Sequence, residues 1–205
     1  MHVIGLTGSI GMGKSHAARC FSAFGIPVFD ADACVRQIMQ SDGAAFPAII
    51  DAFGPEMILN GELNRPKLGA LAFSTPAAKQ TLEGILHPLV RQFELAFLQQ
   101  TRRAHAHFAV LDIPLLFETS GDRLTDYTAV VVTKRWLRDA RLKRSRGMSE
   151  AQIKAVTAHQ MADHEKCKRA DFIINSSADR GFTHAQIANI LAQIANGVRH
   201  AGNRS

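Results

Sequence analysis

The chain has 205 residues, with 24 Lys and Arg against 18 Asp and Glu, and 46% of its residues are hydrophobic. This length and composition are those of a globular domain, and they exclude collagen-like, low-complexity and intrinsically disordered proteins. No apolar run approaches the ~18 residues of a membrane span, and the N-terminus has no export signal, so we expect a cytoplasmic protein.

Short apolar runs rich in β-branched residues alternate with helical patterns along the chain. The runs predict strands, and they lie at residues 2–7, 28–29, 108–112, 127–133 and 170–175. An apolar stripe that repeats every three to four residues predicts helices between them. Residues 14–24 and 41–100 have this helical pattern, and Asn60-Gly61 marks a turn within the second of these stretches.

Strands that are continuous apolar runs are typical of a parallel sheet with helices on both faces. We therefore predict an α/β fold in which a parallel five-stranded sheet is flanked by helices, as a single domain over residues 1–205. Two mostly helical insertions interrupt the alternation of strands and helices, at about 41–105 and about 134–168.

The excess positive charge is confined to one segment. Residues 133–169 hold eleven Lys or Arg against four Asp or Glu, with Trp136 as the single aromatic residue. A surface for duplex nucleic acid more often spreads its charge over a face or interleaves it with aromatic side chains. The cluster therefore suits a small polyanion better, and the alternative from another class is a nucleotide-dependent protein that holds RNA on this segment.

Residues 8–15, with the sequence GSIGMGKS, match the pattern G-x-x-x-x-G-K-S. Glycines allow backbone conformations in which successive N–H groups wrap a phosphate, and the following helix presents its positive end to the same anion. In this motif the lysine, here Lys14, contacts the outer phosphates, and the hydroxyl of Ser15 binds Mg²⁺. The pattern predicts a nucleoside triphosphate site; a glycine-rich turn with an exposed lysine is the alternative.

The length of the chain and the missing guanine motif narrow the class of nucleotide-binding protein. GTP-binding switches carry an N/T-K-x-D motif, and the nearest match, at residues 133–136, has Trp136 where the aspartate must be. Large ATP-driven motors need a longer chain than this one. A small-molecule kinase fits the length of 205 residues.

Five motifs in series resemble the dephospho-coenzyme A kinase family. In chain order they are GLTGSIGMGKS at 5–15, DAD at 30–32, LHP at 86–88, DIPLLFE at 112–118 and ADFIIN at 170–175. The resemblance implies a P-loop kinase core with a helical substrate domain and a lid, which the two insertions would supply. It also implies transfer of the ATP γ-phosphoryl group to the ribose 3′-hydroxyl of dephospho-coenzyme A, the last step of coenzyme A synthesis.

The resemblance implies catalytic and metal-binding roles for individual residues. Asp32 matches the acid that takes the proton of the acceptor hydroxyl, with a helix N-cap as the alternative, and Asp30 is expected to share in binding the acceptor or the metal. Asp112 ends a strand and is expected to hold Mg²⁺ with Ser15, unless it is a capping residue. Because phosphoryl transfer has a highly charged transition state, Lys14 is expected to contribute to catalysis by neutralising charge.

A lid arginine and a residue near the adenine complete the expected ATP site. Arg141 occupies the register of the family's lid arginine and is expected to act in catalysis on the ATP phosphates. Gly147 is expected to end the helix that carries Arg141. Asn175 resembles the family residue near the adenine, and a turn-forming asparagine is the alternative. The expected ATP-binding residues are Gly8, Ile10, Gly11, Met12, Gly13, Lys14, Ser15, His16, Arg141 and Asn175.

Residues 113–117 are too apolar for an ordinary exposed loop, and the resemblance makes them part of the acceptor site, with core packing as the alternative. His87 and Arg65 also match family positions, and the alternatives are a structural histidine and a surface arginine. The expected acceptor-binding residues are Asp30, Asp32, Arg65, His87, Pro114, Leu115 and Leu116.

The expected partners are ATP and dephospho-coenzyme A, with no nucleic acid, membrane or obligatory protein partner. The second hypothesis is another small P-loop kinase, acting on a nucleoside, a nucleoside monophosphate or a shikimate-like acceptor. Such relatives are not expected to carry the motifs at 86–88 and 112–118, and these two motifs therefore favour the first hypothesis.

Overall fold

The computed structural model describes residues 1–72, 74–158 and 160–197, and it divides into two compact units. One unit combines Met1–Phe29 with the described residues from Thr101 onward, and the other is Asp30–Gln100. The insertion predicted at about 41–105 overlaps the second unit, and its role in binding an acceptor remains a prediction. Among the described helices, none is both long and apolar enough to cross a membrane.

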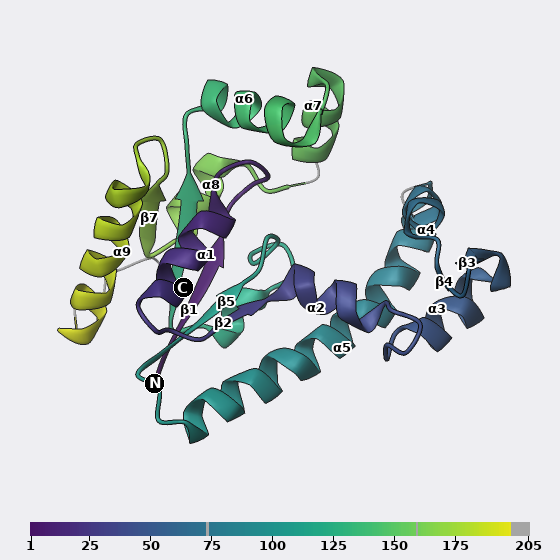
Figure 1. Cartoon of the computed structure of the whole chain (residues 1–205), viewed down its shortest axis with the longest axis horizontal. Coiled ribbons are helices and arrows are strands. Elements are labelled where there is room, and N and C mark those ends of the chain that lie inside the picture. Colours follow the sequence, from purple (N-terminus) through teal and green to yellow (C-terminus); the bar gives the residue numbers. More distant parts are fainter. Residues whose placement is uncertain (73, 159, 198–205) are drawn as a thin grey trace. The chain divides into compact units, whose positions relative to one another are not determined.

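The first unit is built on a parallel sheet, which has five strands within the described residues (Figure 1). The strands are β1 (His2–Thr7), β2 (Val28–Asp30), β5 (Phe108–Asp112), β6 (Tyr127–Val132) and β7 (Phe172–Asn175). Their order across the sheet is β2-β5-β1-β6-β7, and Ile4 of β1 lies opposite Val110 on one side and Tyr127 on the other. The predicted α/β fold with a parallel five-stranded sheet is confirmed.

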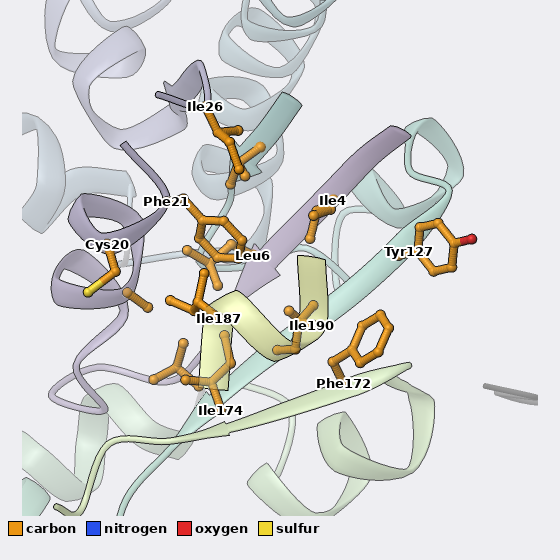
Figure 2. Packing of buried hydrophobic residues seen from close by; sticks show 14 of the residues in the cluster. Ile4, Leu6, Cys20, Phe21, Ile26, Tyr127, Phe172, Ile174, Ile187 and Ile190 are labelled. Carbon is orange, nitrogen blue, oxygen red and sulfur yellow. The ribbon is translucent and has the colours of Figure 1, made fainter. Parts of the chain in front are cut away.

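Helices cover the sheet on both faces. The helices that pack on its strands are α1 (Lys14–Ala23), the short 3-10 helix η2 (Gly121–Leu124), α8 (Asp163–Arg169) and α9 (Arg180–Ala195). The helices α6 (Arg135–Arg146) and α7 (Glu150–Ala158) pack against each other beyond the end of β6 (Figure 1). Figure 2 shows Ile4 and Leu6 of β1 packed against Phe21 of α1 and Ile187 and Ile190 of α9. Because alternate residues of a strand share a face, this cluster places α1 and α9 on one side of the sheet.

The opposite face of β1 is packed closely enough to need a glycine. Gly5 lies between Ile4 and Leu6 and faces the other side, where an added Cβ would stand 2.8 Å from Cδ2 of Leu116. Leu116 itself is fully buried. The segment that follows β5 therefore packs directly on the backbone of β1, which fixes its position relative to the end of that strand.

The second unit is mainly helical. Its elements are α2 (Ala31–Ile38), α3 (Phe46–Phe53), the 3-10 helix η1 (Pro55–Met57), β3 (Ile58–Leu59), β4 (Glu62–Leu63), α4 (Arg65–Ala72) and α5 (Pro76–Arg103), whose last turn belongs to the first unit. The predicted turn at Asn60-Gly61 is confirmed, and both residues have positive φ, 54° and 83°. That conformation joins β3 and β4 as an antiparallel hairpin, where the sequence predicted a helical stretch.

The carboxyl ends of parallel strands meet at one edge of a sheet, which is where α/β proteins bind ligands. The glycine loop follows β1, Asp112 is the last residue of β5, and α6 begins three residues after Val132, the last residue of β6. Asn175 is the last residue of β7. The fold therefore brings the predicted nucleotide-binding residues of the first unit to the same edge.

Candidate active site

The glycine loop leads from β1 into α1 through two residues with left-handed backbone conformation. Gly11 has φ +78° and Gly13 has φ +94°, values that favour glycine. An added Cβ on Gly13 would stand 2.8 Å from the Ser176 hydroxyl oxygen. Gly13 is also the N-cap of α1, which has no side-chain cap. The positive end of α1 is therefore available to an anion, as the motif predicts.

Lys14 lies against the carboxylate at the end of β5. Its Nζ is 2.5 Å from Oδ1 of Asp112, and the two side chains are 13% and 5% exposed. This ion pair holds the motif lysine at the carboxyl edge of the sheet. The neighbouring Ser15 is exposed in the first turn of α1.

Ser15 and Asp112 offer the oxygen ligands that Mg²⁺ prefers in proteins. Mg²⁺ in phosphoryl-transfer sites is held by one or two protein oxygens together with substrate phosphates and water, so a cage of several carboxylates is not needed. Within the described ranges, no group of three or more His, Cys, Asp and Glu side chains forms such a cage. The donor set therefore fits a Mg²⁺ ion that is bound together with a nucleotide.

Arg141 of α6 reaches the loop that follows β7. Its Nη1 donates to the Ser176 hydroxyl at 3.0 Å, and its Nη2 donates to the Ser176 carbonyl oxygen at 2.7 Å. The Ser176 hydroxyl in turn donates to the carbonyl oxygen of Met12 at 2.6 Å. The side chain of Asn175 accepts from the Ser177 N–H at 2.8 Å, which is a turn-forming contact.

Gly147 ends α6 with φ +61°, as the sequence predicts.

Two residues at the start of α8 and just before it contact the glycine loop. Ser9 Oγ donates to Oδ1 of Asp163 at 2.5 Å, and the Ile10 N–H donates to Oε1 of Gln160 at 3.2 Å. A pocket of about 370 Å³ beside these contacts is lined in part by Arg138.

Much of the positive charge in residues 133–169 is neutralised within the first unit. Six of its cations form ion pairs with acids, some inside the segment and some outside it. These pairs are Arg135–Asp139, Arg138–Asp139, Lys143–Glu150, Lys168–Glu165, Lys166–Glu118 and Arg169–Asp122. The segment is therefore less cationic at its surface than its composition indicates.

The segment after β5 is fixed by a buried lysine of α8. Lys166 is 0% exposed, and its Nζ lies 3.0 Å from Oε1 of Glu118 and 3.3 Å from the Pro114 carbonyl oxygen. Thr7 Oγ1 donates to the same carbonyl at 3.0 Å, and the Met161 N–H donates to Glu118 at 2.8 Å. These bonds tie both ends of residues 114–118 to the sheet and to the start of α8.

The residues expected to bind the acceptor in this segment differ in exposure. Pro114 and Leu115 are half-buried, so they are open to a ligand in part. Leu116 is fully buried against Gly5 and packs in the core, which was the alternative for this residue.

In the second unit, Asp30 and Asp32 occupy different positions at the start of α2. Asp30 is the N-cap, and its Oδ1 accepts from the Ala33 N–H at 2.9 Å. Asp32 is exposed in the first turn, and its carboxylate makes no hydrogen bond or ion pair with any residue that the structure describes. The capping role that was the alternative for Asp32 therefore belongs to Asp30.

The other two expected acceptor residues lie on α4 and α5. Arg65 is exposed in the first turn of α4, and its Nη2 donates to the Arg36 carbonyl oxygen at 2.8 Å. His87 is exposed on α5, directly before Pro88, which lies inside the helix. Both roles in acceptor binding remain predictions.

The fold and the glycine loop together define the class. A sheet whose first strand leads through G-x-x-x-x-G-K-S into a helix, with Lys14 against the carboxylate of Asp112, is the arrangement of a P-loop kinase. A crystal structure from Thermus thermophilus is similar, with a TM-score of 0.82 and 30% identity over 94% of this chain and 97% of that one. The dephospho-CoA kinase from Campylobacter jejuni has a TM-score of 0.70 and 25% identity, over 95% and 98%.

Sequence comparison identifies the family within that class. A family model described as Dephospho-CoA kinase matches residues 2–180. A curated dephospho-CoA kinase from Nitrobacter winogradskyi is 46% identical over 195 residues, which are 95% of this chain and 96% of that protein. The chain belongs to the dephospho-CoA kinase family, as its motifs indicate.

Sequence reasoning missed four polar residues that contact the loops of the site. Gln160 and Asp163 contact the glycine loop, Lys166 contacts the segment after β5, and Ser176 contacts Met12. No motif marks the first three, and the contact made by Ser176 spans 164 positions of sequence. The position of Ser176 directly after Asn175 is the one signal that the sequence offers.

Proposed function

We propose that the chain transfers the γ-phosphoryl group of ATP to the ribose 3′-hydroxyl of dephospho-coenzyme A, which yields ADP and coenzyme A. The observation that carries this proposal is the arrangement at the carboxyl edge of the sheet. There Lys14 lies beside Asp112 at the uncapped start of α1, in a chain of the dephospho-CoA kinase family.

On the donor side, we assign the phosphates of ATP to the glycine loop, Lys14 and Arg141. The transition state of phosphoryl transfer is loose and highly charged, so catalysis rests on positioning and on neutralisation of charge. We assign Mg²⁺ to Ser15 and Asp112, where the bound ion would neutralise charge on the phosphates. Asn175 is assigned to the neighbourhood of the adenine, and its turn with Ser177 would set the course of the chain there.

On the acceptor side, Asp32 is the proposed general base. A carboxylate can take the proton of the 3′-hydroxyl as the oxygen attacks phosphorus. The exposed position of Asp32 and the capping role of Asp30 support this assignment. We assign dephospho-coenzyme A to Asp30, Asp32, Arg65, His87 and residues 114–116. The cytoplasmic location remains a prediction.

The test is an acceptor panel. ADP release is measured with Mg²⁺ and ATP in the presence of dephospho-coenzyme A, and in parallel with adenosine, AMP, CMP or shikimate. We expect turnover with dephospho-coenzyme A and little with the others. Faster turnover with another acceptor would refute the proposed substrate while keeping the kinase chemistry.

A further inference from the structure

Ser176 connects two segments that carry the proposed ATP site. It follows the last residue of β7 and is 4% exposed. Its hydroxyl donates to the Met12 carbonyl oxygen at 2.6 Å and accepts from Nη1 of Arg141 at 3.0 Å. The directions are fixed, because a carbonyl oxygen can only accept and a guanidinium can only donate. One buried hydroxyl is therefore satisfied in both of its roles.

The contact with Met12 sets the direction of a backbone N–H group. A trans peptide is planar, so its C=O and N–H point in opposite directions. The carbonyl of Met12 points at Ser176, and the N–H of Gly13 in the same peptide therefore points away from Ser176. An added Cβ on Gly13 would stand 2.8 Å from the Ser176 hydroxyl oxygen, so the two residues are packed closely.

The contact with Arg141 sets the plane of the guanidinium. Two of its nitrogens donate to one residue, Nη1 to the hydroxyl and Nη2 to the carbonyl oxygen of Ser176. A planar group held at two points has little freedom to rotate. These bonds use two of the five N–H donors of the guanidinium, and three remain for a phosphate.

We propose that Ser176 is a positioning residue for the phosphoryl donor, because its hydroxyl orients both the Gly13 N–H and the Arg141 guanidinium. The inference rests on the proposed function, in which these two groups contact the phosphates of ATP. Ser176 acts through them and has no contact of its own with the substrates.

The Ser176→Ala variant tests the proposal. It removes the hydroxyl and keeps the bond from Arg141 Nη2 to the backbone. Because hydrogen bonds of charged groups are the stronger ones, we expect the KM for ATP to rise about tenfold, while the KM for dephospho-coenzyme A and the Tm stay near their wild-type values. Ser176→Thr keeps a hydroxyl and is expected to retain most of the affinity for ATP.

Ser177→Ala is the matched control. The Ser177 hydroxyl lies 3.1 Å from Thr133 Oγ1 and accepts from the Lys134 N–H at 3.2 Å. The contacts of its side chain are thus with the loop after β6. Ser177→Ala keeps the backbone N–H that donates to Asn175, so the variant is expected to leave the KM for ATP unchanged. An unchanged KM for ATP in Ser176→Ala, or an equal rise of both KM values, would overturn the proposal.

A double-mutant cycle with Arg141→Ala tests whether Ser176 acts through the arginine. We expect Ser176→Ala to lower kcat/KM for ATP less in the Arg141→Ala protein than in the wild type. If the loss of kcat/KM in the double variant equals the product of the losses in the two single variants, Ser176 does not act through Arg141.

Calorimetric titration with Mg²⁺ and ADP makes the test independent of the acceptor, and we expect both single variants to bind ADP more weakly than the wild type does. Normal ADP affinity in Ser176→Ala would overturn this inference alone. A wild-type protein that binds ADP without turning over dephospho-coenzyme A would overturn only the proposed function.

Discussion

Asp30 and Asp32 have the same side chain but different surroundings at the start of α2. The side chain of Asp30 already has two partners. Its Oδ1 accepts from the Ala33 N–H, and its Oδ2 lies 3.9 Å from Nη2 of Arg36. Asp32 is two positions further on and exposed, with its carboxylate turned to no neighbour in the described chain. A reactive carboxylate needs such a position, since a group already engaged in capping cannot easily take a proton from a substrate.

We therefore expect Asp32→Asn to lower kcat by at least about a hundredfold, the scale of general base catalysis, while the Tm changes little. Asp30→Asn is the matched control, because Asn caps helices about as well as Asp, and its loss of kcat should be much smaller. The measurement is steady-state kinetics on both variants with thermal unfolding in parallel. Near-wild-type turnover in Asp32→Asn would remove Asp32 as the base.

The contact between α8 and the segment after β5 depends on one buried ion pair. Lys166 is 0% exposed, whereas the side chain of Glu118 is 19% exposed. An ammonium without its partner would therefore be left in the interior, whereas a carboxylate without its partner could still reach water and would keep the Met161 N–H. Removing Glu118 should therefore lower the free energy of unfolding more than removing Lys166.

We predict that Glu118→Gln lowers the free energy of unfolding by about 3–5 kcal/mol, the range for leaving a buried charge without its partner. Lys166→Met replaces the charge with an apolar side chain of similar volume and should cost less, about 1–3 kcal/mol. Urea unfolding of the two variants beside the wild type gives this order. If Lys166→Met lowers the free energy of unfolding as much as Glu118→Gln does, the unequal exposure of the two side chains does not determine the stability of the pair.

The same pair should make stability depend on pH. Burial alone would raise the pKa of Glu118, but hydrogen bonds from the Met161 N–H and Lys166, together with the charge of Lys166, lower it below its ordinary value of 4.5. A carboxylate with a lowered pKa in the folded state stabilises the protein fully above its unfolded pKa, and the effect is lost as the pH falls through the folded pKa. We expect the stability of the wild type to fall more steeply below about pH 5 than that of Glu118→Gln. Parallel pH profiles for the two proteins would contradict this account.

The strands and the glycine loop could be predicted because their signals are local. Two continuous apolar runs predicted β1 and β5 with the observed bounds, and the spacing of the glycines and Lys14 predicted the glycine loop. The hairpin of β3 and β4 was missed, although its turn was predicted, because two-residue strands are too short to show an alternating pattern.

The two compact units also divide the proposed site along the chain. All residues proposed to bind ATP lie in the first unit, whereas Asp30, Asp32, Arg65 and His87, proposed for the acceptor, lie in the second. Residues 114–116 are proposed for the acceptor as well and belong to the first unit.

The contacts that hold the site together are where sequence reasoning failed. Ser176 meets Met12 across 164 positions of sequence, and Lys166 meets Pro114 across 52. Pairings of this kind are set by the order of the strands in the sheet and by the helices that pack on it, and a single sequence does not contain that information in its local pattern. The pairing of Lys14 with Asp112 was also not predicted, although both residues were assigned to the site.

The proposed reaction transfers the γ-phosphoryl group of ATP to one hydroxyl of one acceptor. The most direct measurement uses ATP labelled in its γ-phosphoryl group, Mg²⁺ and dephospho-coenzyme A, and locates the label in the product by phosphorus NMR and mass spectrometry. We predict one labelled phosphate on the ribose 3′-oxygen and no labelling of an acceptor that lacks the 3′-hydroxyl. Label on inorganic phosphate alone, or at another position of the acceptor, would contradict the account.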